Sequence, residues 1–161
     1  MKHLNNFMEM VIEGIESYKV KLLPGDEFVV KYAFSDVDGN EYLAQFKNDS
    51  SGPKNNKMLG NSYELTYFVW DDELEDWSIG KMVNANIFRL IKTIFGEIAT
   101  SFLRDNPWVK VLRFEGLAKE EEKSFITQRT KLYVRYLSNN PIDGYRMESY
   151  GNLINLVKIV K

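Results

Sequence analysis

The sequence predicts an α+β fold: a two-layer single domain with N-terminal antiparallel strands, then a long helix, a strand, a helix and a C-terminal hairpin. Two observations predict it. In the first half, apolar and polar residues alternate between turn signals, whereas the second half changes to helical spacing. The 161 residues show no internal repeat and suit one core, so residues 1–161 are expected to form one domain.

A helix and four strands are expected in the first half. Residues 1–17 carry apolar side chains at helical spacing and predict a short amphipathic helix. The strands are expected at 18–23, 27–34, 41–46 and 62–70. Asp38-Gly39 suits a hairpin turn, because both residue types tolerate the positive φ that such turns need. Residues 48–61 are polar and predict one long loop.

Two helices and three strands are expected in the second half. The first helix begins at a capping residue, Asn84 or Asn86, and runs to Arg104, before Pro107. Its apolar stripe consists of Ile87, Ile91, Ile94, Ile98 and Phe102. The second helix is expected at about 123–137. The strands are expected at 108–115, 145–150 and 153–160, the last two as a hairpin.

The residue composition excludes several classes of site. The chain has no cysteine and one histidine, His3, which removes thiol catalysis, disulfide scaffolds, zinc fingers and nearly every histidine-based site. No phosphate-binding or dinucleotide-binding glycine motif occurs. The sequence therefore predicts no catalytic residue, no metal ligand and no cofactor, and the protein is not expected to be an enzyme.

A cytoplasmic protein without a membrane partner is expected. Glu9 and Glu13 interrupt the N-terminal apolar stripe, so it does not form a secretory signal. No run approaches the ~20 apolar residues that span a bilayer. The absence of cysteine fits a reducing compartment.

Charge is divided unequally along the chain. Residues 1–80 hold 7 basic and 15 acidic side chains, a net charge of −8, whereas residues 81–161 hold 14 basic and 8 acidic ones, a net charge of +6. Such a division can steer association between proteins. The candidate interaction surface consists of Asp71, Asp72, Glu73, Glu75, Asp76, Lys131 and Arg135. The alternative is that these charges are merely solvated.

The same division of charge predicts self-association, with a dimer as the expected form. Phe68, Trp70 and Trp77 lie on either side of the acidic run and add large aromatic side chains to it. Exposed aromatic groups of this kind mark contact surfaces. The protein is therefore expected to be a homo-oligomer.

Arg129 is a charged residue within an apolar helical stripe. Large apolar residues lie three and four positions away from it on both sides, so they share its face of the helix. An arginine there must be paired, because an unpaired buried charge is costly. We expect a largely buried side chain that pairs with backbone carbonyls or with Glu115 or Glu148 of a flanking strand. The alternative is contact with an anion or ligand in a cleft.

The helix that carries Arg129 also shows a resemblance. The segment Thr127-Gln128-Arg129-Thr130-Lys131-Leu132-Tyr133 follows a long helix, Pro107 and a Val-rich strand. It resembles the Ser/Gln-Arg-Thr-Arg/Lys-Leu-Tyr signature of a family of small uncharacterised α/β proteins of bacteriophages and Bacteroidetes. The resemblance covers about residues 27–161, and Lys131 stands where arginine is common. It implies a phage setting, in the host cytoplasm or the virion, and no particular activity.

Two main functions are compatible with these features, and a small-ligand binder or an unrecognised hydrolase is a third option. The first is a non-catalytic phage-type accessory protein that binds a protein, either in the virion or in the host. The divided charge and the missing catalytic constellation favour it. The alternative is nucleic-acid binding by the basic second half, with Lys92, Arg104, Lys110, Arg113, Lys119, Lys123, Lys131 and Arg135 as candidate residues. The acidic half and the pI of 5.6 argue against the alternative.

Overall fold

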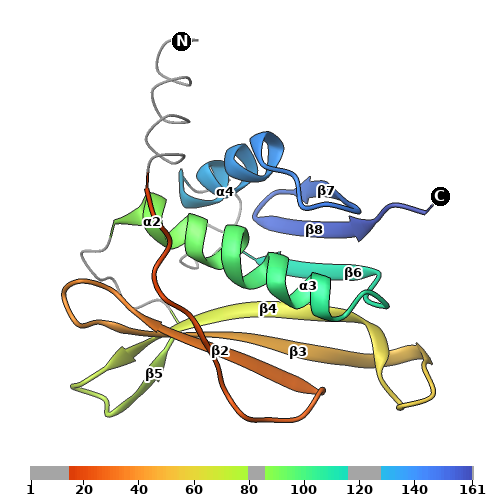
Figure 1. Cartoon of the computed structure of the whole chain (residues 1–161), viewed down its shortest axis with the longest axis horizontal. Coiled ribbons are helices and arrows are strands. Elements are labelled where there is room, and N and C mark those ends of the chain that lie inside the picture. The colour runs from red at the N-terminus through yellow and green to blue at the C-terminus, as the bar shows by residue number, and fades with distance from the viewer. Residues whose placement is uncertain (1–14, 80–85, 116–127, 161) are drawn as a thin grey trace.

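The computed structural model describes residues 15–79, 86–115 and 128–160, and all of its labelled helices and strands lie in these ranges. Its eight strands form one mixed sheet in the order β1-β2-β3-β4-β6-β8-β7, and β5 pairs with the end of β4 (Figure 1). The strands are β1 Lys21–Leu22, β2 Val29–Ser35, β3 Glu41–Lys54, β4 Gly60–Asp71, β5 Asp76–Ser78, β6 Val111–Glu115, β7 Tyr145–Tyr150 and β8 Leu153–Lys158. The helical elements are α2 Ile87–Ile91, η1 Lys92–Ala99, α3 Thr100–Asp105 and α4 Gln128–Asn139.

The predicted fold class is wrong. Of the described residues, 43% lie in strands and 24% in helices. A single mixed sheet replaces the predicted helix–strand–helix layout. The difference arises where β4 and β6 pair in parallel, with Ser62 opposite Val111 and Leu65 opposite Phe114. A parallel pair needs a crossover connection, which the 19-residue helix formed by α2, η1 and α3 supplies. Periodicity identifies elements, but it does not say which strands are neighbours.

The described helices pack on one face of the sheet, called here the helix face. Phe46 of β3 and Tyr63 of β4 are buried on it. Phe102 of α3 stacks on Phe46 with ring centroids 4.0 Å apart and meets Tyr63 edge-on at 4.9 Å. The opposite face, called here the open face, carries exposed charges such as Lys47 and Glu64, and no described helix packs on it.

The second helix, α4, packs against the first through a glycine. A Cβ atom at Gly96 would lie 2.6 Å from the Tyr136 hydroxyl, so a larger residue there would require the Tyr136 side chain to move. Tyr133 of α4 is fully buried, with ring centroids 5.4 Å from Phe95 and 5.1 Å from Phe114. These contacts join both helices to β6 in one core.

The long helix is capped as predicted but widens in its middle. Asn86 caps it, because its side chain accepts hydrogen bonds from two backbone N–H groups of the first turn. The segment η1 is a π-helix rather than the predicted α-helix. Along the whole long helix, pairs of adjacent buried apolar residues recur at every fourth position, from Leu90-Ile91 to Phe102-Leu103. That spacing exceeds the 3.6 residues per turn of an α-helix, so a wider helix keeps the pairs on the sheet.

The prediction of a long loop at 48–61 is wrong, because most of these residues extend β3 and β4. Buried Asn48 joins the two strands: its Oδ1 accepts from the Gly60 N–H at 3.0 Å, and its Nδ2 donates to the Gly60 carbonyl at 2.8 Å. The strand register shifts between Asp49 and Lys54. An irregular hairpin of this kind tolerates polar residues that look like a loop in sequence.

Strand β5 was not expected from the sequence. It folds back on β4 and places Trp77 opposite Trp70, with ring centroids 5.4 Å apart in a T-shaped arrangement. The Trp70 Nε1–H donates to Asp72 Oδ1 at 3.0 Å. Cross-strand aromatic pairs stabilise a hairpin, so the acidic run becomes a tight turn.

The ends of the chain agree with the sequence in part. The C-terminal hairpin is confirmed: β7 pairs with β8, and Gly151 in the turn has a φ of 59°. The expected strand at 18–23 is shorter and contributes only β1. The expected helix at 1–17 and the start of the expected helix at 123–137 lie outside the described residues, apart from 15–17. Within the described part, no helix is long and apolar enough to cross a membrane.

Candidate functional site

Strand β2 has an edge that β1 leaves open. The two strands pair only through Lys21 opposite Ala33 and Leu22 opposite Tyr32. Before Lys21 the chain leaves β2, because the Tyr18 N–H donates to Thr93 Oγ1 of the long helix at 2.9 Å. Among the described residues, no strand therefore pairs with this edge beyond Ala33.

The backbone of Ser35 points toward this open edge. In antiparallel pairs, alternate residues direct their N–H and C=O groups to opposite sides. The Asp36 N–H donates to the Asn40 carbonyl, on the β3 side of the strand. The Leu23 N–H donates to the Lys31 carbonyl, on the β1 side. Ser35 has the same parity as Lys31, so its N–H and C=O face away from β3.

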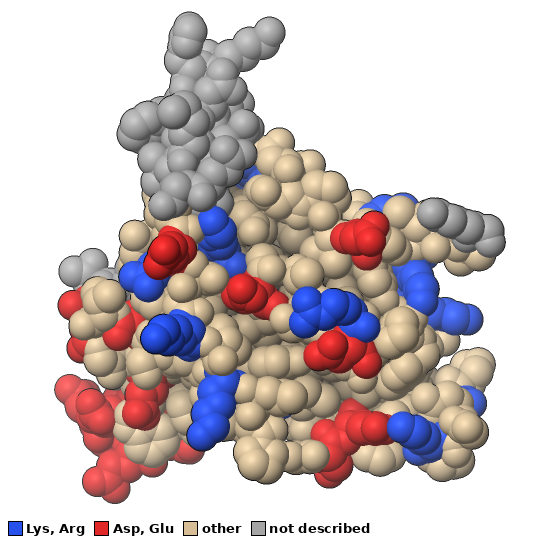
Figure 2. Space-filling model, viewed as in Figure 1, with Lys and Arg blue, Asp and Glu red and all other residues tan. Residues whose placement is uncertain are grey.

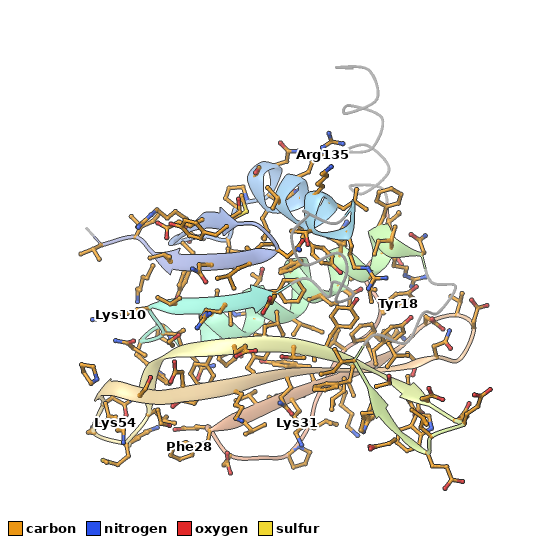
Figure 3. All side chains as sticks on the ribbon, turned by 180° about the vertical axis from the view of Figure 1, so that it is seen from behind. Tyr18, Phe28, Lys31, Lys54, Lys110 and Arg135 are labelled. Atoms are coloured by element: carbon orange, nitrogen blue, oxygen red, sulfur yellow. The ribbon has the colours of Figure 1, made fainter. Side chains whose placement is uncertain are left out.

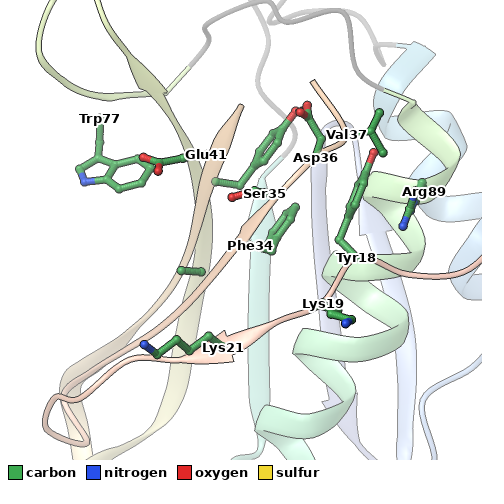
Figure 4. A pocket seen from close by; sticks show the side chains of 12 residues that line it. Tyr18, Lys19, Lys21, Phe34, Ser35, Asp36, Val37, Glu41, Trp77 and Arg89 are labelled. Atoms are coloured by element: carbon green, nitrogen blue, oxygen red, sulfur yellow. The ribbon is translucent and has the colours of Figure 1, made fainter. Parts of the chain in front are cut away.

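A groove of about 640 Å³ runs along this edge (Figure 4). Five consecutive residues, 33–37, line it. Ala33, Phe34 and Ser35 belong to β2, and Asp36 and Val37 follow in the turn. Because side chains alternate between the two faces of a strand, three successive strand residues can line one groove only along the edge of the strand. Tyr18 and Arg89 line the groove on the helix-face side of β2, and Trp77 lies on the other side.

An aromatic stack supports the helix-face wall. The Tyr18 ring stacks on Phe34 at 5.8 Å between centroids, and Phe34 stacks on Tyr42 at 4.8 Å. The Arg89 guanidinium carbon lies 4.1 Å from the centroid of the Tyr18 ring, a cation–π contact. These contacts hold the side chains of the helix-face wall in place.

Asp36 holds the turn at the end of the groove. Its carboxylate accepts hydrogen bonds from the backbone N–H groups of Asp38 and Asn40, from the Asn40 side chain and from the Tyr42 hydroxyl. Burial alone would raise the pKa of Asp36, but these hydrogen bonds outweigh it and hold the pKa below its ordinary value. The Asp36 carboxylate is thus already hydrogen-bonded by groups of the protein itself.

Replacing Asp36 by asparagine is expected to destabilise the protein by about 1.5–3 kcal/mol at neutral pH, the range for hydrogen bonds to a charged group. A lowered carboxyl pKa stabilises the folded state above the unfolded pKa, and this contribution is lost as pH falls through the folded pKa. Denaturant unfolding between neutral pH and about pH 2 should therefore show the two proteins converging below about pH 4. Asp38→Asn, on an exposed side chain of the same turn, is the control. A cost independent of pH would contradict the assignment.

Three cations surround the groove. Lys19 and Lys21 line it and have no ion-pair partner among the described residues. Arg89 also lines it, and its buried Nε has no hydrogen-bond partner in that part of the chain. The remaining carboxylate of the lining is the exposed Glu41, since Asp36 is occupied. Three cations thus line the groove together with one carboxylate that its own turn does not already hold.

Sequence reasoning did not identify Tyr18, Arg89 or Thr93. One signal was available: Thr93 is a polar residue next to the apolar stripe of the long helix. It is fully buried, donates to the Arg89 carbonyl at 2.8 Å and accepts from Tyr18. A buried hydroxyl of this kind implies a partner from elsewhere in the chain.

The predicted interaction surface is divided between two places. Its acidic members, Asp71, Asp72, Glu73, Glu75 and Asp76, form the turn between β4 and β5, at the lower left of Figure 2. Lys131 and Arg135 lie on α4, far from that turn (Figure 3). Lys131 is exposed and Arg135 is half-buried. These residues therefore do not form one surface within a single chain.

Arg129 pairs with the sheet, but not with the expected partner. It is half-buried rather than largely buried as predicted, and its Nη1 donates to the Tyr67 hydroxyl of β4 at 2.8 Å. The Tyr67 hydroxyl lies 3.5 Å from that of Tyr133. Glu115 and Glu148 were wrong choices, because strand alternation places both on the open face. Burial raises the pKa of Tyr133 well above its ordinary value, so this hydroxyl stays protonated.

The basic residues proposed for nucleic-acid binding are dispersed. Lys92 and Arg104 lie on the long helix, and Arg113 lies on the open face. Lys110 and Arg135 are well separated in Figure 3. Lys119 and Lys123 lie outside the described residues. The described part of the second half therefore forms no continuous basic stripe.

Comparison with known proteins adds no relative. No protein-family model matches the chain, and no similar curated protein or solved structure was found. In the described ranges, no three His, Cys, Asp or Glu side chains lie close enough together to hold a metal ion. The groove along β2 is thus the candidate site with the best-defined geometry.

Proposed function

We propose that the protein is a non-catalytic binding module whose groove along β2 accepts an extended, acidic segment of a partner protein. The observation that carries this proposal is the open edge of β2, where the Ser35 backbone faces a groove lined by residues 33–37. An exposed strand edge is a template for another strand, and strand addition is a recurring mode of peptide recognition.

The walls of the groove suit a strand in this position. A bound segment would continue the line of β1 and form main-chain hydrogen bonds with Ser35. Its side chains would alternate between the helix-face wall, with Tyr18 and Arg89, and the opposite wall, with Trp77. Aromatic residues and arginine are enriched at protein interfaces, because they provide large contact areas and directed hydrogen bonds.

The charges of the groove favour acidic side chains in the partner. Lys19, Lys21 and Arg89 line it, whereas Asp36 is occupied by its own turn. Opposite charges steer a partner to its site and fix its register. The dispersed basic residues of the second half offer no comparable site for nucleic acid.

The setting that we propose is a bacteriophage one, in the host cytoplasm or the virion. Support comes from the signature around Arg129 and its resemblance to small proteins of phages and Bacteroidetes. The partner is then a virion component or a host protein.

Selection from a library of random displayed peptides tests the proposal. Selected peptides are expected to share acidic residues at alternate positions, and fluorescence polarisation should show that they bind the protein. Lys19→Glu combined with Lys21→Glu should weaken binding by about tenfold or more. Ser35→Pro should weaken it as well, since proline removes an N–H that faces the groove and not β3.

Two open-face lysines away from the groove provide the matched control. Lys31→Glu combined with Lys47→Glu makes the same charge change and should leave peptide binding unchanged. Thermal melting verifies that each variant is folded. Selected peptides that lack acidic residues, or that bind the Lys19 and Lys21 variant as well as the control, would refute the proposal. Tight binding of an RNA or DNA oligomer at physiological salt would favour the nucleic-acid alternative.

A further inference from the structure

The sheet ends on its other side at β7, which has no strand partner beyond β8 among the described residues. Tyr150 pairs with Leu153 across a two-residue turn, so Tyr150, Glu148 and Arg146 direct their backbone groups toward β8. Met147 and Ser149 therefore direct theirs outward. The Tyr145 N–H confirms this parity, since it donates to the Ile142 carbonyl and not to β8.

We propose that two copies of the chain associate through this edge, with the β7 strands antiparallel and Met147 opposite Met147 of the second copy. In this register, Arg146 lies opposite Glu148 of the second copy, and Glu148 lies opposite its Arg146. Both residues are on the open face, where Arg146 Nη2 and Glu148 Oε2 are already 2.9 Å apart within one chain. Opposite charges in directly opposed positions stabilise a strand pair.

The backbone permits the same register. Met147 points its N–H and C=O outward, so two copies centred on it exchange both hydrogen bonds. A dimer centred on Glu148 would place two glutamates opposite each other, on residues whose backbone groups already bind β8. Like charges in that position destabilise the pair.

The helix-face side of this edge has room for the second copy. A groove of about 290 Å³ lies beside β7, and its lining includes the apolar residues Leu137, Ile142 and Leu156 together with Ser138 and Arg146. Met147 shares the helix face with Leu156, its partner in β8. Directly opposed residues lie on the same face, so Met147 of the second copy would enter this groove. Methionine fits irregular apolar spaces well.

A mixing experiment with two charge reversals tests this inference on the full chain. Sedimentation velocity at about 100 µM, a concentration at which even weak complexes form, should give wild-type protein at twice the chain mass of 18.8 kDa. Arg146→Glu and Glu148→Arg should each be monomeric alone, because like charges then face each other. An equimolar mixture of the two variants should form dimers again, since each charge meets its opposite across the edge.

The mixture separates association from effects on folding. Each variant loses the ion pair within its own chain, and mixing does not restore it. A dimer in the mixture can therefore come only from pairing between copies. Monomeric wild-type protein, dimeric single variants or a mixture that stays monomeric would each overturn the inference. The experiment does not involve the β2 groove, so its outcome is independent of peptide binding.

Discussion

Replacing Phe102 by alanine is expected to lower the free energy of unfolding by about 3–5 kcal/mol, the range for removing a buried phenylalanine ring. Phe102 is fully buried between the long helix and the sheet. Its ring stacks on Phe46 and meets Tyr63 edge-on, so the loss removes both the apolar burial and two aromatic contacts. Denaturant unfolding followed by circular dichroism measures the effect.

Phe28→Ala is the matched control, because it makes the same chemical change at a side chain that is 43% exposed. It should cost less than about 1 kcal/mol, as expected for a surface substitution. Similar losses in the two variants would show that the long helix does not anchor the core. Such a result would also remove the support for the groove, whose helix-face wall carries Arg89 of the same helix.

Local patterns in the sequence identified several elements correctly. The cap at Asn86 and the C-terminal hairpin were predicted from residue types that have one dominant local role. The loop predicted at 48–61 failed because its strand pairing depends on one buried side chain, that of Asn48. Strand β5 was missed because Trp77 pairs with Trp70 across an acidic turn that has no strand character of its own.

The fold class and the candidate site could not be predicted, because both depend on contacts between distant residues. The parallel pairing of β4 with β6 is decided by the packing of the long helix, which no local pattern records. The groove exists because Tyr18 binds Thr93, 75 positions away in the chain. Arg129 was correctly singled out as needing a partner, but Tyr67 comes from a strand that is remote in sequence.

The two open edges of the sheet have different chemical characters. At β2 the edge is short, lies beside a wide groove and is surrounded by cations. At β7 the edge carries one residue of each charge, Arg146 and Glu148. The edge of one copy is therefore complementary in charge to the same edge of a second, antiparallel copy. In a dimer formed through β7, the two β2 grooves would lie at opposite ends of a continuous sheet. A partner with two acidic segments could then bind both grooves and gain affinity through avidity.

Replacing Gly60 by alanine is expected to destabilise the protein by about 3 kcal/mol, the upper end of the usual range for overpacking. A Cβ atom at this position would lie 1.9 Å from the Asp49 carbonyl oxygen, a backbone atom that cannot rotate away. Moving the strands apart would break the bonds between Asn48 and the Gly60 backbone and leave buried polar groups unpaired. Thermal melting and denaturant unfolding measure the loss.

Gly25→Ala provides the control for this substitution. There the added Cβ would meet only the Val29 carbonyl oxygen at 3.4 Å, an ordinary contact, so stability should change by less than about 0.5 kcal/mol. The difference between the two glycines tests the irregular hairpin itself, because a flexible loop at 48–61 would accept alanine at position 60 without cost. Equal stability of the two variants would therefore support the loop that the sequence predicts and would contradict the extension of β3 beyond Asn48.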